Sequence, residues 1–377
     1  MIALFGFLMA ALIFWRLVLP LKCRWYWKCA AATVILAACL KMQIMHLLGG
    51  PNYFAPDLPG WFLLGSAWLY SVAFLLFFLL AAAEIVRTVV QEIYRFRKRP
   101  LPEAYPRILR RVYAVLLAAA VILASTGIAE GLARPRIHEL TLRFPDLPAS
   151  AEGLRIALMA DLHAHTIIRA PQIRQMVRAA NACRPDLILI VGDFVDGTLD
   201  ERKDELVPLK ELRARSGVYG VSGNHEYYSG YSEWKPYLTA AGVRMLDDEN
   251  VKLPCGIWLA GVTDPAGQGR WNAPPDLERA LKGIPPGAFT VLMAHRPGAA
   301  DKASRHGVAL QLSGHTHGGM ILGFDRIVAR FNGGYVAGLY EIGGTKLYVS
   351  NGTGIWNGFP IRLGRPAEIT LITLSAK

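Results

Sequence analysis

Cysteine is scarce in this chain, and the few cysteines form no recognisable pattern. Five are spread over 377 residues, and no two of them are separated by only two positions. Cys23, Cys29 and Cys39 lie in or beside long apolar runs, whereas Cys183 and Cys255 lie beyond these runs and 72 positions apart. Small secreted domains are held by disulfide frameworks, and redox or zinc sites often use a C-x-x-C pair. We therefore expect neither, and interpret the cysteines as small buried hydrophobic residues.

Long apolar runs, by contrast, are abundant in the first third of the chain. The sequence is 53% hydrophobic, which is more than an ordinary soluble protein needs. Four runs approach the roughly 20 residues that a helix needs to cross a bilayer: Ile2 to Leu21, about Trp27 to Leu48, Trp61 to Ala83, and Val112 to Ala129. We expect an α-helical membrane domain with four spans over residues 1–132. No signal peptide with a small-residue cleavage site stands out, so we expect the first span to remain.

Basic residues near the ends of these runs predict their orientation, because cytoplasmic loops are enriched in Lys and Arg. The loop after the first run carries Lys22, Arg24 and Lys28. The segment between the third and fourth runs carries Arg87, Arg95, Arg97, Lys98, Arg99, Arg107, Arg110 and Arg111. The loop over residues 49–60 has no basic residue and should lie on the opposite face. Arg134 and Arg136 oppose this orientation, but two charges do not outweigh eight. We expect a multi-pass protein of the inner (plasma) membrane, with everything after the fourth span on the periplasmic or extracytoplasmic side.

The same basic residues account for most of the net charge of +12. Residues 1–150 hold 16 Lys and Arg against 7 Asp and Glu, a balance of +9, which leaves +3 for the remainder. Because the basic residues serve membrane topology, they are poor support for nucleic-acid binding. We expect no nucleic-acid partner.

Beyond about residue 136 the sequence changes to short apolar runs separated by Gly, Pro, Asp and Asn, which is typical of strands. The runs predicted as strands are LRIALMA, DLILIVG, GVYGVSG, IWLAGVT, FTVLMAH, VALQLSG, KLYVSNG and EITLITL. PQIRQMVRAANACR, between the first two, predicts a helix and therefore two parallel strands, whereas YEIGGTKLYV predicts an antiparallel pair. We expect an α/β sandwich over residues 154–377, after a linker and lead-in strand over residues 133–153.

Residues of the kinds that bind metals follow five of the predicted strands. In open α/β sheets, ligand-binding side chains gather in the loops at the carboxyl ends of strands. Five of the nine histidines occupy such positions. The full set is Asp161, His163, Asp193, Asn224, His225, His295, His315 and His317. Chance placement would not concentrate them in this way, so the pattern predicts one shared site.

The spacing of these residues indicates metal binding. Asp161 and His163 are alternate residues, so their side chains share one face of an extended segment, as do those of His315 and His317. Two such pairs, joined by single ligands, could surround more than one ion. Carboxylate, imidazole and amide oxygen together favour Mn²⁺, Fe²⁺ or Zn²⁺, whereas Ca²⁺ prefers oxygen ligands alone. Asp193, between two cations, could neutralise both.

The motifs D-x-H, G-D-x-x-D, G-N-H-E, H and G-H-x-H follow one another between residues 161 and 317. In this order they resemble the calcineurin-like metallophosphoesterase family. The separations of 32 residues from Asp161 to Asp193 and 31 from Asp193 to Asn224 are also similar to those of the family. From about Ile137 onward the chain resembles the membrane-anchored bacterial branch. The resemblance covers roughly the last 240 residues and does not extend to the first 130.

The resemblance implies a four-layer α/β/β/α sandwich with two divalent metal ions. One ion would be bound by Asp161, His163, Asp193 and His317, and the other by Asp193, Asn224, His295 and His315. Asp193 would bridge the two ions. A hydroxide between the ions, formed because metal coordination lowers the pKa of water to about 7, would attack phosphorus. His225 would be the general acid and Asp196 would orient it.

Other residues bear on the substrate. Gly197 follows Asp196 where the protein Ser/Thr phosphatases of this superfamily carry an arginine, which disfavours that activity. Arg296 and Arg362 could bind a substrate phosphate, because a guanidinium group suits bidentate phosphate contacts. His165 matches no family ligand, and we expect it to be an exposed loop residue.

These features favour a phosphomonoesterase or phosphodiesterase at the outer face of the membrane. A lipid or lipid-linked phosphate is the expected substrate, because an enzyme for a soluble substrate rarely needs several spans. One alternative is a nucleotide-lipid pyrophosphatase that faces the cytoplasm, which requires the opposite topology. The other is a non-catalytic metal-binding scaffold in the membrane, which the complete set of ligand residues disfavours.

Overall fold

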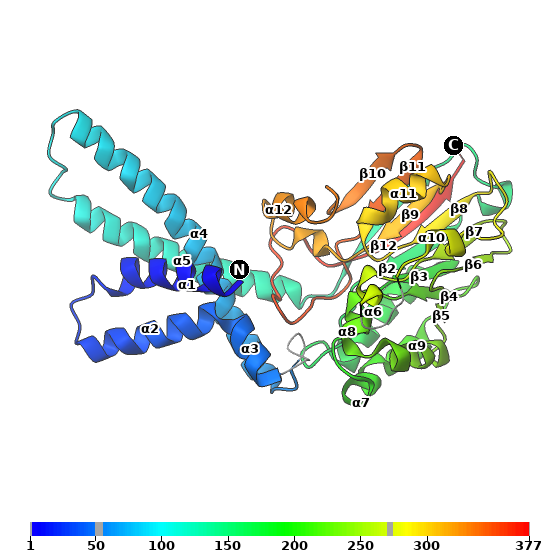
Figure 1. The fold of residues 1–377 in the computed structure, drawn as a ribbon, viewed down its shortest axis with the longest axis horizontal. Helices are drawn as coiled ribbons and strands as arrows, with labels where there is room; N and C mark the ends of the chain where they lie inside the picture. Colours follow the sequence, from blue (N-terminus) through cyan, green and yellow to red (C-terminus); the bar gives the residue numbers. More distant parts are fainter. Residues whose placement is uncertain (1, 50–55, 270–273, 377) are drawn as a thin grey trace. The chain divides into compact units, whose positions relative to one another are not determined.

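The computed structural model describes residues 2–49, 56–269 and 274–376. The chain divides into two compact units, Met1–Ala129 and Glu130–Lys377, which we call the helical unit and the α/β unit (Figure 1). All five cysteines are free thiols. The interpretation as buried residues holds for Cys39, whereas Cys183 and Cys255 are half-buried and Cys23 and Cys29 are exposed.

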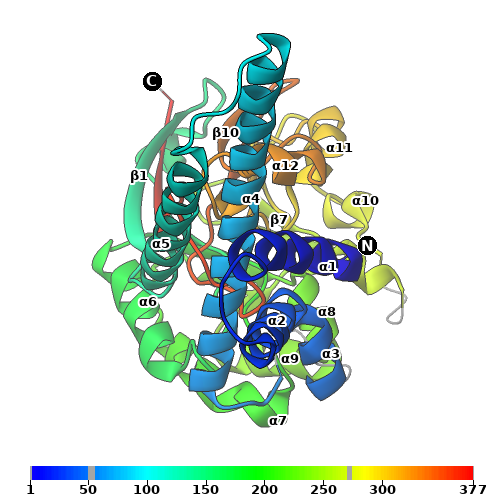
Figure 2. The ribbon, with the colours of Figure 1, turned by 90° about the vertical axis from the view of Figure 1, so that its left-hand side faces the viewer.

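The helical unit consists of long apolar helices (Figure 2). They are α1 (Ile2–Ile13), continued by a π-helical turn (Phe14–Val18), α2 (Trp25–Cys39), α3 (Lys41–Gly49), α4 (Gly60–Phe96) and α5 (Tyr105–Gly131). Many of their large apolar side chains are exposed, including those of Trp25, Leu47 and Trp61. A helix with an apolar surface is typical of a segment surrounded by lipid.

Among the described residues, two helices are long and apolar enough to cross a membrane, α4 and α5. Helices α2 and α3 pass the same test only when they are counted together as one span. The helix is interrupted between them, and the two helices are bent by 73° at this interruption. The first apolar helix, Ala3–Val18, has 16 residues and spans roughly 24 Å at 1.5 Å per residue, less than the roughly 30 Å hydrocarbon core. The structure therefore supports two spans, or up to three, rather than a clear set of four. The loop over residues 49–60 lies largely outside the described residues.

One polar cluster joins three helices of this unit. The Glu84 carboxylate on α4 accepts hydrogen bonds from the Arg16 guanidinium, from Arg87 Nε at 2.8 Å, and from the Tyr113 hydroxyl on α5. Arg16 lies on the π-helical turn after α1. The negative charge is therefore balanced within the chain itself.

The α/β unit contains two six-stranded sheets. The first has the order β1 (Arg136–Arg143), β12 (Glu368–Ser375), β2 (Arg155–Met159), β3 (Leu187–Val191), β4 (Val218–Val221) and β5 (Arg244–Met245). The second has the order β10 (Gly338–Ile342), β11 (Thr345–Val349), β9 (Leu310–Ser313), β8 (Thr290–Met293), β7 (Trp258–Gly261) and β6 (Glu249–Lys252). All eight predicted strands are present, and β2 and β3 are parallel while β10 and β11 are antiparallel, as expected.

Helices cover the outer faces of both sheets. On the first sheet they are α6 (Ala170–Ala182) and α9 (Tyr231–Ala240), and on the second they are α10 (Leu277–Ala280) and α11 (Ala300–Arg305). The short helices α7 (Leu199–Arg202), α8 (Asn224–Ser229) and α12 (Asp325–Arg330) follow β3, β4 and β9, and α12 has no buried residue. Ile173 of α6 and Trp234 of α9 pack with Ile188 of β3 on the first sheet, and Leu277 of α10 packs with Leu292 of β8 on the second.

The core between the sheets explains the continuous apolar strands. Alternate residues of β3 point to opposite sides: Leu189 lies in the core between the sheets, whereas Ile188 faces the helices. Both faces of the strand are buried, so every position is apolar. The segment over residues 143–153, interpreted from sequence as a linker, also contributes Phe144, Leu147 and Ala151 to this core. It is a packed part of the unit.

Candidate metal centre

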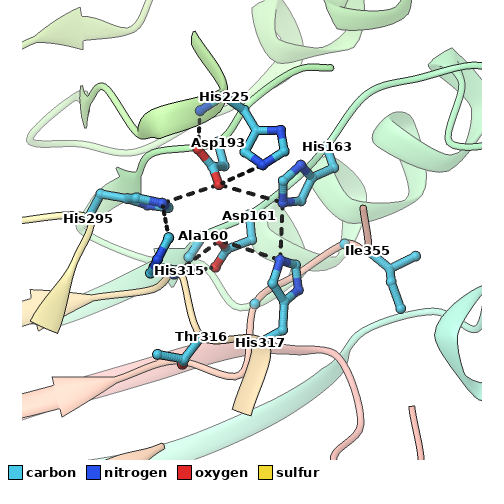
Figure 3. A network of polar contacts seen from close by, with 12 residues as sticks. Ala160, Asp161, His163, Asp193, His225, His295, His315, Thr316, His317 and Ile355 are labelled. Atoms are coloured by element: carbon cyan, nitrogen blue, oxygen red, sulfur yellow. Dashed lines mark hydrogen bonds and ion pairs between the residues drawn. The ribbon is translucent and has the colours of Figure 1, made fainter. Parts of the chain in front are cut away.

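The predicted ligands lie in the loops that leave the strands at one edge of each sheet. Strands β2, β3 and β4 run parallel in the first sheet, and β7, β8 and β9 run parallel in the second. The carboxyl ends of parallel strands meet at a common edge. Figure 3 shows the carboxylates and imidazoles from the loops after β2, β3, β4, β8 and β9 pointing toward one another. The structure therefore brings together residues that are up to 156 positions apart, from Asp161 to His317.

The ligand loops adopt an unusual backbone conformation. Among the described residues, nine other than glycine have a positive φ, and five of these are predicted ligands: Asp161, His163, Asp193, His315 and His317, with φ between 47° and 71°. This region is unfavourable for residues with a Cβ atom, and such strain concentrates at functional sites. The surrounding fold holds the backbone in this form and aims the side chains inward.

Close backbone approach explains two glycines of the motifs. A Cβ atom on Gly223 would lie 2.2 Å from Asp193 Oδ1, and one on Gly314 would lie 2.5 Å from Asp161 Oδ2. The carboxylates instead accept hydrogen bonds from the neighbouring backbone: His225 N donates to Asp193 at 2.9 Å, and His315 N donates to Asp161 at 3.0 Å. Each carboxylate is thus fixed by the loop of another strand.

Asp161, His163 and His317 form one group whose ligand atoms all lie within 4.8 Å of one another. His163 Nε2 and His317 Nε2 are 3.1 Å apart, and His317 Nε2 lies 3.7 Å from Asp161 Oδ1. All three side chains are buried. These are three of the four residues predicted to bind the first ion, and the fourth is Asp193.

Asp193, His295 and His315 form a second group with the same compactness. His295 Nε2 lies 3.1 Å from Asp193 Oδ2, 3.2 Å from His315 Nδ1 and 3.2 Å from Asn224 Oδ1. Asp193 Oδ2 is also 3.7 Å from His163 Nε2. Asp193 therefore lies between the two groups, where a bridging ligand would be needed.

The donor atoms fit a bound cation. Among the described residues, the hydrogen-bond partner of His295 Nδ1 is the carbonyl oxygen of Val191, at 2.8 Å, so this nitrogen carries the proton in the neutral ring. Nε2 then carries a lone pair, yet it faces the carboxylate oxygen of Asp193 and the amide oxygen of Asn224. Several lone pairs that converge in a buried space suit a divalent metal ion, and the mixture of imidazole, carboxylate and amide suits borderline metals.

The pKa values of the cluster have clear physical causes. Burial lowers the pKa of His315 and of His317 well below the ordinary value, which keeps both rings in the neutral form that binds metals. Burial would lower the pKa of His295 too, but Asp193 raises it to about 10. Burial would raise the pKa of Asp193, but His295 and then His225 hold it well below its usual range. The protein alone thus uses protons on histidine to balance this carboxylate.

Asp196 contacts two histidines. Its Oδ1 atom lies 2.6 Å from His225 Nδ1 and 2.8 Å from His163 Nδ1, and the carboxylate is buried. Although burial would raise its pKa, His163 and then His225 hold the pKa of Asp196 far below its ordinary value. Burial would lower the pKa of His225, but Asp193 and Asp196 raise it to about 9. The expected contact with His225 is present, and the contact with His163 is an addition that the spacing did not indicate.

Glu226 is a part of the site that sequence reasoning passed over. This fully buried carboxylate accepts hydrogen bonds from the backbone N–H groups of Asp193 at 2.9 Å, Phe194 at 2.7 Å and Gly223 at 2.7 Å. It thereby fixes the loop after β3 against the loop after β4. The acid that directly follows Asn224 and His225 was the available signal, but two of its three partners, Asp193 and Phe194, lie 33 and 32 residues away.

The two arginines predicted to bind substrate lie in different surroundings. Arg296 donates from Nε and Nη2 to the buried carboxylate of Asp264, at 2.8 and 3.1 Å, and its side chain stays 34% exposed. Arg362 is fully buried, and Nη2 donates to the carbonyl oxygens of Asn351 and Gly354 at 2.8 and 2.7 Å. The prediction for Arg362 is wrong in this respect, because backbone carbonyls already occupy its guanidinium. Nη2 also lies 3.2 Å from Nδ1 of His317, so Arg362 supports a ligand ring.

The expectation that His165 is an exposed loop residue is also wrong. Its side chain is 1% exposed, Nδ1 accepts a hydrogen bond from Ile167 N at 3.0 Å, and Nε2 lies 3.0 Å from the carbonyl oxygen of Ile355. Burial lowers its pKa to about 4. Both ring nitrogens have partners within the fold, so this histidine organises the loop and offers no ligand atom.

A cavity of about 340 Å³ lies beside the second group. Its lining is mainly apolar, with Val262, Leu277 and Ala294 among its residues, and includes His295, Arg296 and Lys302. The cavity therefore combines an apolar wall with two cationic side chains and one predicted metal ligand.

Comparison with known proteins places the chain in a family. Residues 154–319 match the sequence profile of the calcineurin-like phosphoesterases. An uncharacterized metallophosphoesterase of Helicobacter pylori is 36% identical over 253 residues, which cover 67% of each chain. One from Campylobacter jejuni is 31% identical over 314 residues, 82% of this chain and 81% of its own. A transmembrane protein with metallophosphoesterase domain from Bos taurus is 36% identical over 288 residues, 71% of this chain and 63% of its own.

The buried carboxylates and imidazoles at the strand ends of a two-sheet α/β unit define a metal-dependent phosphoesterase. The chain belongs to the calcineurin-like metallophosphoesterase family, so the predicted resemblance is confirmed. The apolar helices further make it a membrane-associated member of that family.

Proposed function

We propose that the protein hydrolyses a lipid or lipid-linked phosphate at the outer face of the membrane that anchors it. Residues 1–132 would be the membrane domain, 133–153 the lead-in and 154–377 the catalytic domain. The observation that supports the hydrolase most directly is the position of Asp193 between two groups of ligand atoms, 3.1 Å from His295 Nε2 and 3.7 Å from His163 Nε2. A single carboxylate in that position can serve two cations.

The residues would be divided between two divalent ions. Asp161, His163, Asp193 and His317 would bind one, and Asp193, Asn224, His295 and His315 the other. Mn²⁺, Fe²⁺ and Zn²⁺ all suit this donor set. When bound, such ions lower the pKa of coordinated water and offset the negative charge on phosphoryl oxygens.

His225 would donate a proton to the oxygen that leaves phosphorus. Its Nδ1 atom is held by Asp196 at 2.6 Å, which leaves Nε2 directed at the site, 3.9 Å from Asp193 Oδ2. A histidine oriented by a carboxylate is a common general acid. Asp196 would fix the ring and stabilise its protonated form.

The cavity beside His295 supports a substrate with an apolar part. Its mainly apolar lining suits hydrocarbon better than a sugar or a nucleobase, whose polar groups would lack partners there. Arg296 would contact the phosphate while remaining oriented by Asp264. Arg362 is not proposed as a substrate contact. The transmembrane helices of this chain, and the similar protein from Bos taurus described as a transmembrane protein, are consistent with a substrate presented at the bilayer.

The proposed orientation depends on the last two apolar helices alone. The turn between α4 and α5 and the adjoining helix ends carry basic residues, including the exposed Arg97, Lys98 and Arg99. If this turn is cytoplasmic, as such charges favour, α5 leads the chain outward and the α/β unit follows. The conclusion is the same whether two, three or four segments cross the membrane.

The hydrolase is tested with the full chain in detergent micelles or lipid nanodiscs loaded with Mn²⁺. Bound metal is measured by elemental analysis, and hydrolysis is followed with p-nitrophenyl phosphate, bis-p-nitrophenyl phosphate and a total membrane lipid extract. We expect about two bound metal ions per chain and hydrolysis of at least one reporter. From the lipid extract we expect a hydrolysis product, which is either a lipid that has lost its phosphate or a fragment that carries it. A protein that binds metal but hydrolyses neither reporter nor lipid would be a binding module instead.

The membrane face is tested separately. A C-terminal alkaline-phosphatase fusion should be active, because that enzyme folds only outside the cytoplasm, and a C-terminal green fluorescent protein fusion should be dark. The reverse result would favour the cytoplasmic alternative, a nucleotide-lipid pyrophosphatase, and would leave the hydrolase assignment intact.

A further inference from the structure

The segment directly after the last metal-ligand motif presents large apolar side chains to solvent. Helix α12 has no buried residue, and Ile327 and Phe331 are 54% and 81% exposed. They are four positions apart, so they lie on the same face of the helical turn. Leu322, just before the helix, is 66% exposed. We call Ile327 and Phe331, together with Leu322, the α12 patch.

Basic side chains flank this apolar face. Arg326 and Arg330 are exposed, and they directly precede Ile327 in the helix and Phe331, which caps the C-terminus of the helix. The only acid of the helix, Asp325, is paired with Arg365 at 2.5 Å, so its charge is offset. An apolar face bordered by arginines is typical of segments that lie in the interface of an anionic membrane.

The α12 patch is rigidly connected to the metal centre. A Cβ atom on Gly319, two residues after His317, would lie 2.5 Å from the Cα atom of Asp325, so the backbone of the ligand loop packs directly on the start of α12. Leu363 reinforces this contact, because its N–H donates to Met320 O and its carbonyl accepts from Leu322 N, both at 2.8 Å. A partner surface that contacts the α12 patch would therefore lie next to the loop that carries His315 and His317.

We propose that the α12 patch inserts into the headgroup region of an anionic lipid bilayer, as a second membrane contact in addition to the apolar helices. The occupant follows from two observations. The chain carries α4 and α5, so a bilayer is present at high effective concentration for the covalently tethered α/β unit. The two exposed arginines would repel the same patch of a second copy but are complementary to acidic lipids.

The consequence concerns how a substrate reaches the metals. Insertion at α12 would place the ligand loop at the depth of lipid headgroups, so a phosphate on a lipid could enter the site without leaving the bilayer. The inference goes beyond the proposed hydrolysis and does not depend on it, because insertion can be measured without metal or turnover.

The experiment uses the full chain, with its native cysteines replaced by alanine or serine, reconstituted into vesicles. An NBD fluorophore is attached through Phe331→Cys or Ile327→Cys, and through Val207→Cys as a matched control. Val207 is 40% exposed on the same unit, but its neighbours Leu206 and Leu209 are buried, so it is an isolated apolar residue. Fluorescence is read in phosphatidylcholine vesicles with and without phosphatidylglycerol, and with nitroxide-labelled lipid as quencher.

We expect quenching at positions 327 and 331 to exceed that at position 207 by about twofold or more, with a blue-shifted emission, in vesicles that contain phosphatidylglycerol. The double change Arg326→Gln with Arg330→Gln should reduce this quenching in the anionic vesicles and leave it unchanged in phosphatidylcholine alone. Equal quenching at 327, 331 and 207 would overturn the proposal. So would a blue shift at 331 that appears in detergent and grows with protein concentration, since that result would identify a second copy as the occupant. Thermal unfolding of each labelled variant checks that the fold is retained.

Discussion

In each unit of this protein a carboxylate lies among charged side chains, half-buried in the helical unit and buried in the α/β unit, but the two units balance this charge in different ways. In the helical unit, Glu84 is neutralised by Arg16 and Arg87 and also accepts from the Tyr113 hydroxyl. In the α/β unit, Asp193 has no Lys or Arg partner among the described residues, and its charged neighbours are histidines.

The difference shows what each cluster requires. An arginine is always charged, so the Glu84 cluster is complete without any ligand. A histidine can balance a carboxylate only when it is protonated, and a protonated ring cannot bind a metal. The cluster around Asp193 is therefore poised between protons and cations, and we infer that bound metal replaces the protons. Substitutions in the two clusters should therefore change different properties. Those around Asp193 should lower metal content and activity, and those around Glu84 should lower the free energy of unfolding.

The largest expected effect is that of Asp193→Asn. The change keeps the size of the side chain but removes the negative charge that both groups of ligands share, so bound metal and activity should fall together. We expect a loss of about 10³-fold or more in kcat/KM on either reporter, which corresponds to several kcal/mol of transition-state stabilisation. Elemental analysis and reporter hydrolysis are measured on the same sample. Asp200→Asn is the control, since the Asp200 side chain is 98% exposed. An active variant with normal metal content would contradict the bridging role.

His225→Ala should reduce activity by about 10²- to 10⁴-fold and leave the metal content unchanged. The proton donated by His225 matters most when the leaving oxygen is basic, so the loss should be larger for alkyl phosphates than for p-nitrophenyl phosphate. The loss of activity caused by His225→Ala is measured separately on the two kinds of substrate, and the two losses are compared. His306→Ala, at an exposed position, is the matched control. An equal loss with both leaving groups would indicate that His225 is a ligand, as its proximity to His163 and Asp193 also permits.

Asp196→Asn is expected to have an intermediate effect, about 10- to 100-fold, because Asp196 contacts His163, a proposed ligand, and His225, the proposed general acid. Loss of the contact to His163 should weaken metal affinity, which His225→Ala should not do. Metal titration of both variants, followed by activity, separates the two contributions. Unchanged metal affinity in Asp196→Asn would limit its role to His225.

The sequence predicted the α/β unit well because local signals agree with the tertiary structure there. Apolar runs such as DLILIVG must be strands buried on both faces, and glycines next to Asp193 and His315 mark sharp strand ends. The grouping of these side chains at one site was predictable because each motif lies within a few residues of its own strand.

The remaining features depend on contacts between distant segments. Nothing near Arg362 in sequence indicates that carbonyl oxygens of residues 351 and 354 occupy its guanidinium group. His165 is buried because Ile355, 190 positions away, covers it. In the helical unit, composition alone did not reveal that the second apolar run is interrupted and bent by 73° between Cys39 and Lys41. This bend and the short first helix, Ala3–Val18, explain why the structure supports fewer than four clear spans.

The smallest effect on activity should come from Glu84→Gln in the helical unit, and this completes the comparison. The amide cannot balance Arg16 and Arg87, so we expect the free energy of unfolding in detergent to fall by about 1.5–3 kcal/mol, as for hydrogen bonds to charged groups. Metal content and reporter hydrolysis should not change, because the cluster lies in the other unit. Glu92→Gln is the control: its ion pair with Arg95 is exposed, with side chains 63% and 82% accessible, and should contribute less than about 0.5 kcal/mol. If Glu84→Gln instead released metal from the α/β unit, the two units would be coupled, and charge balance in the membrane helices would be part of catalysis.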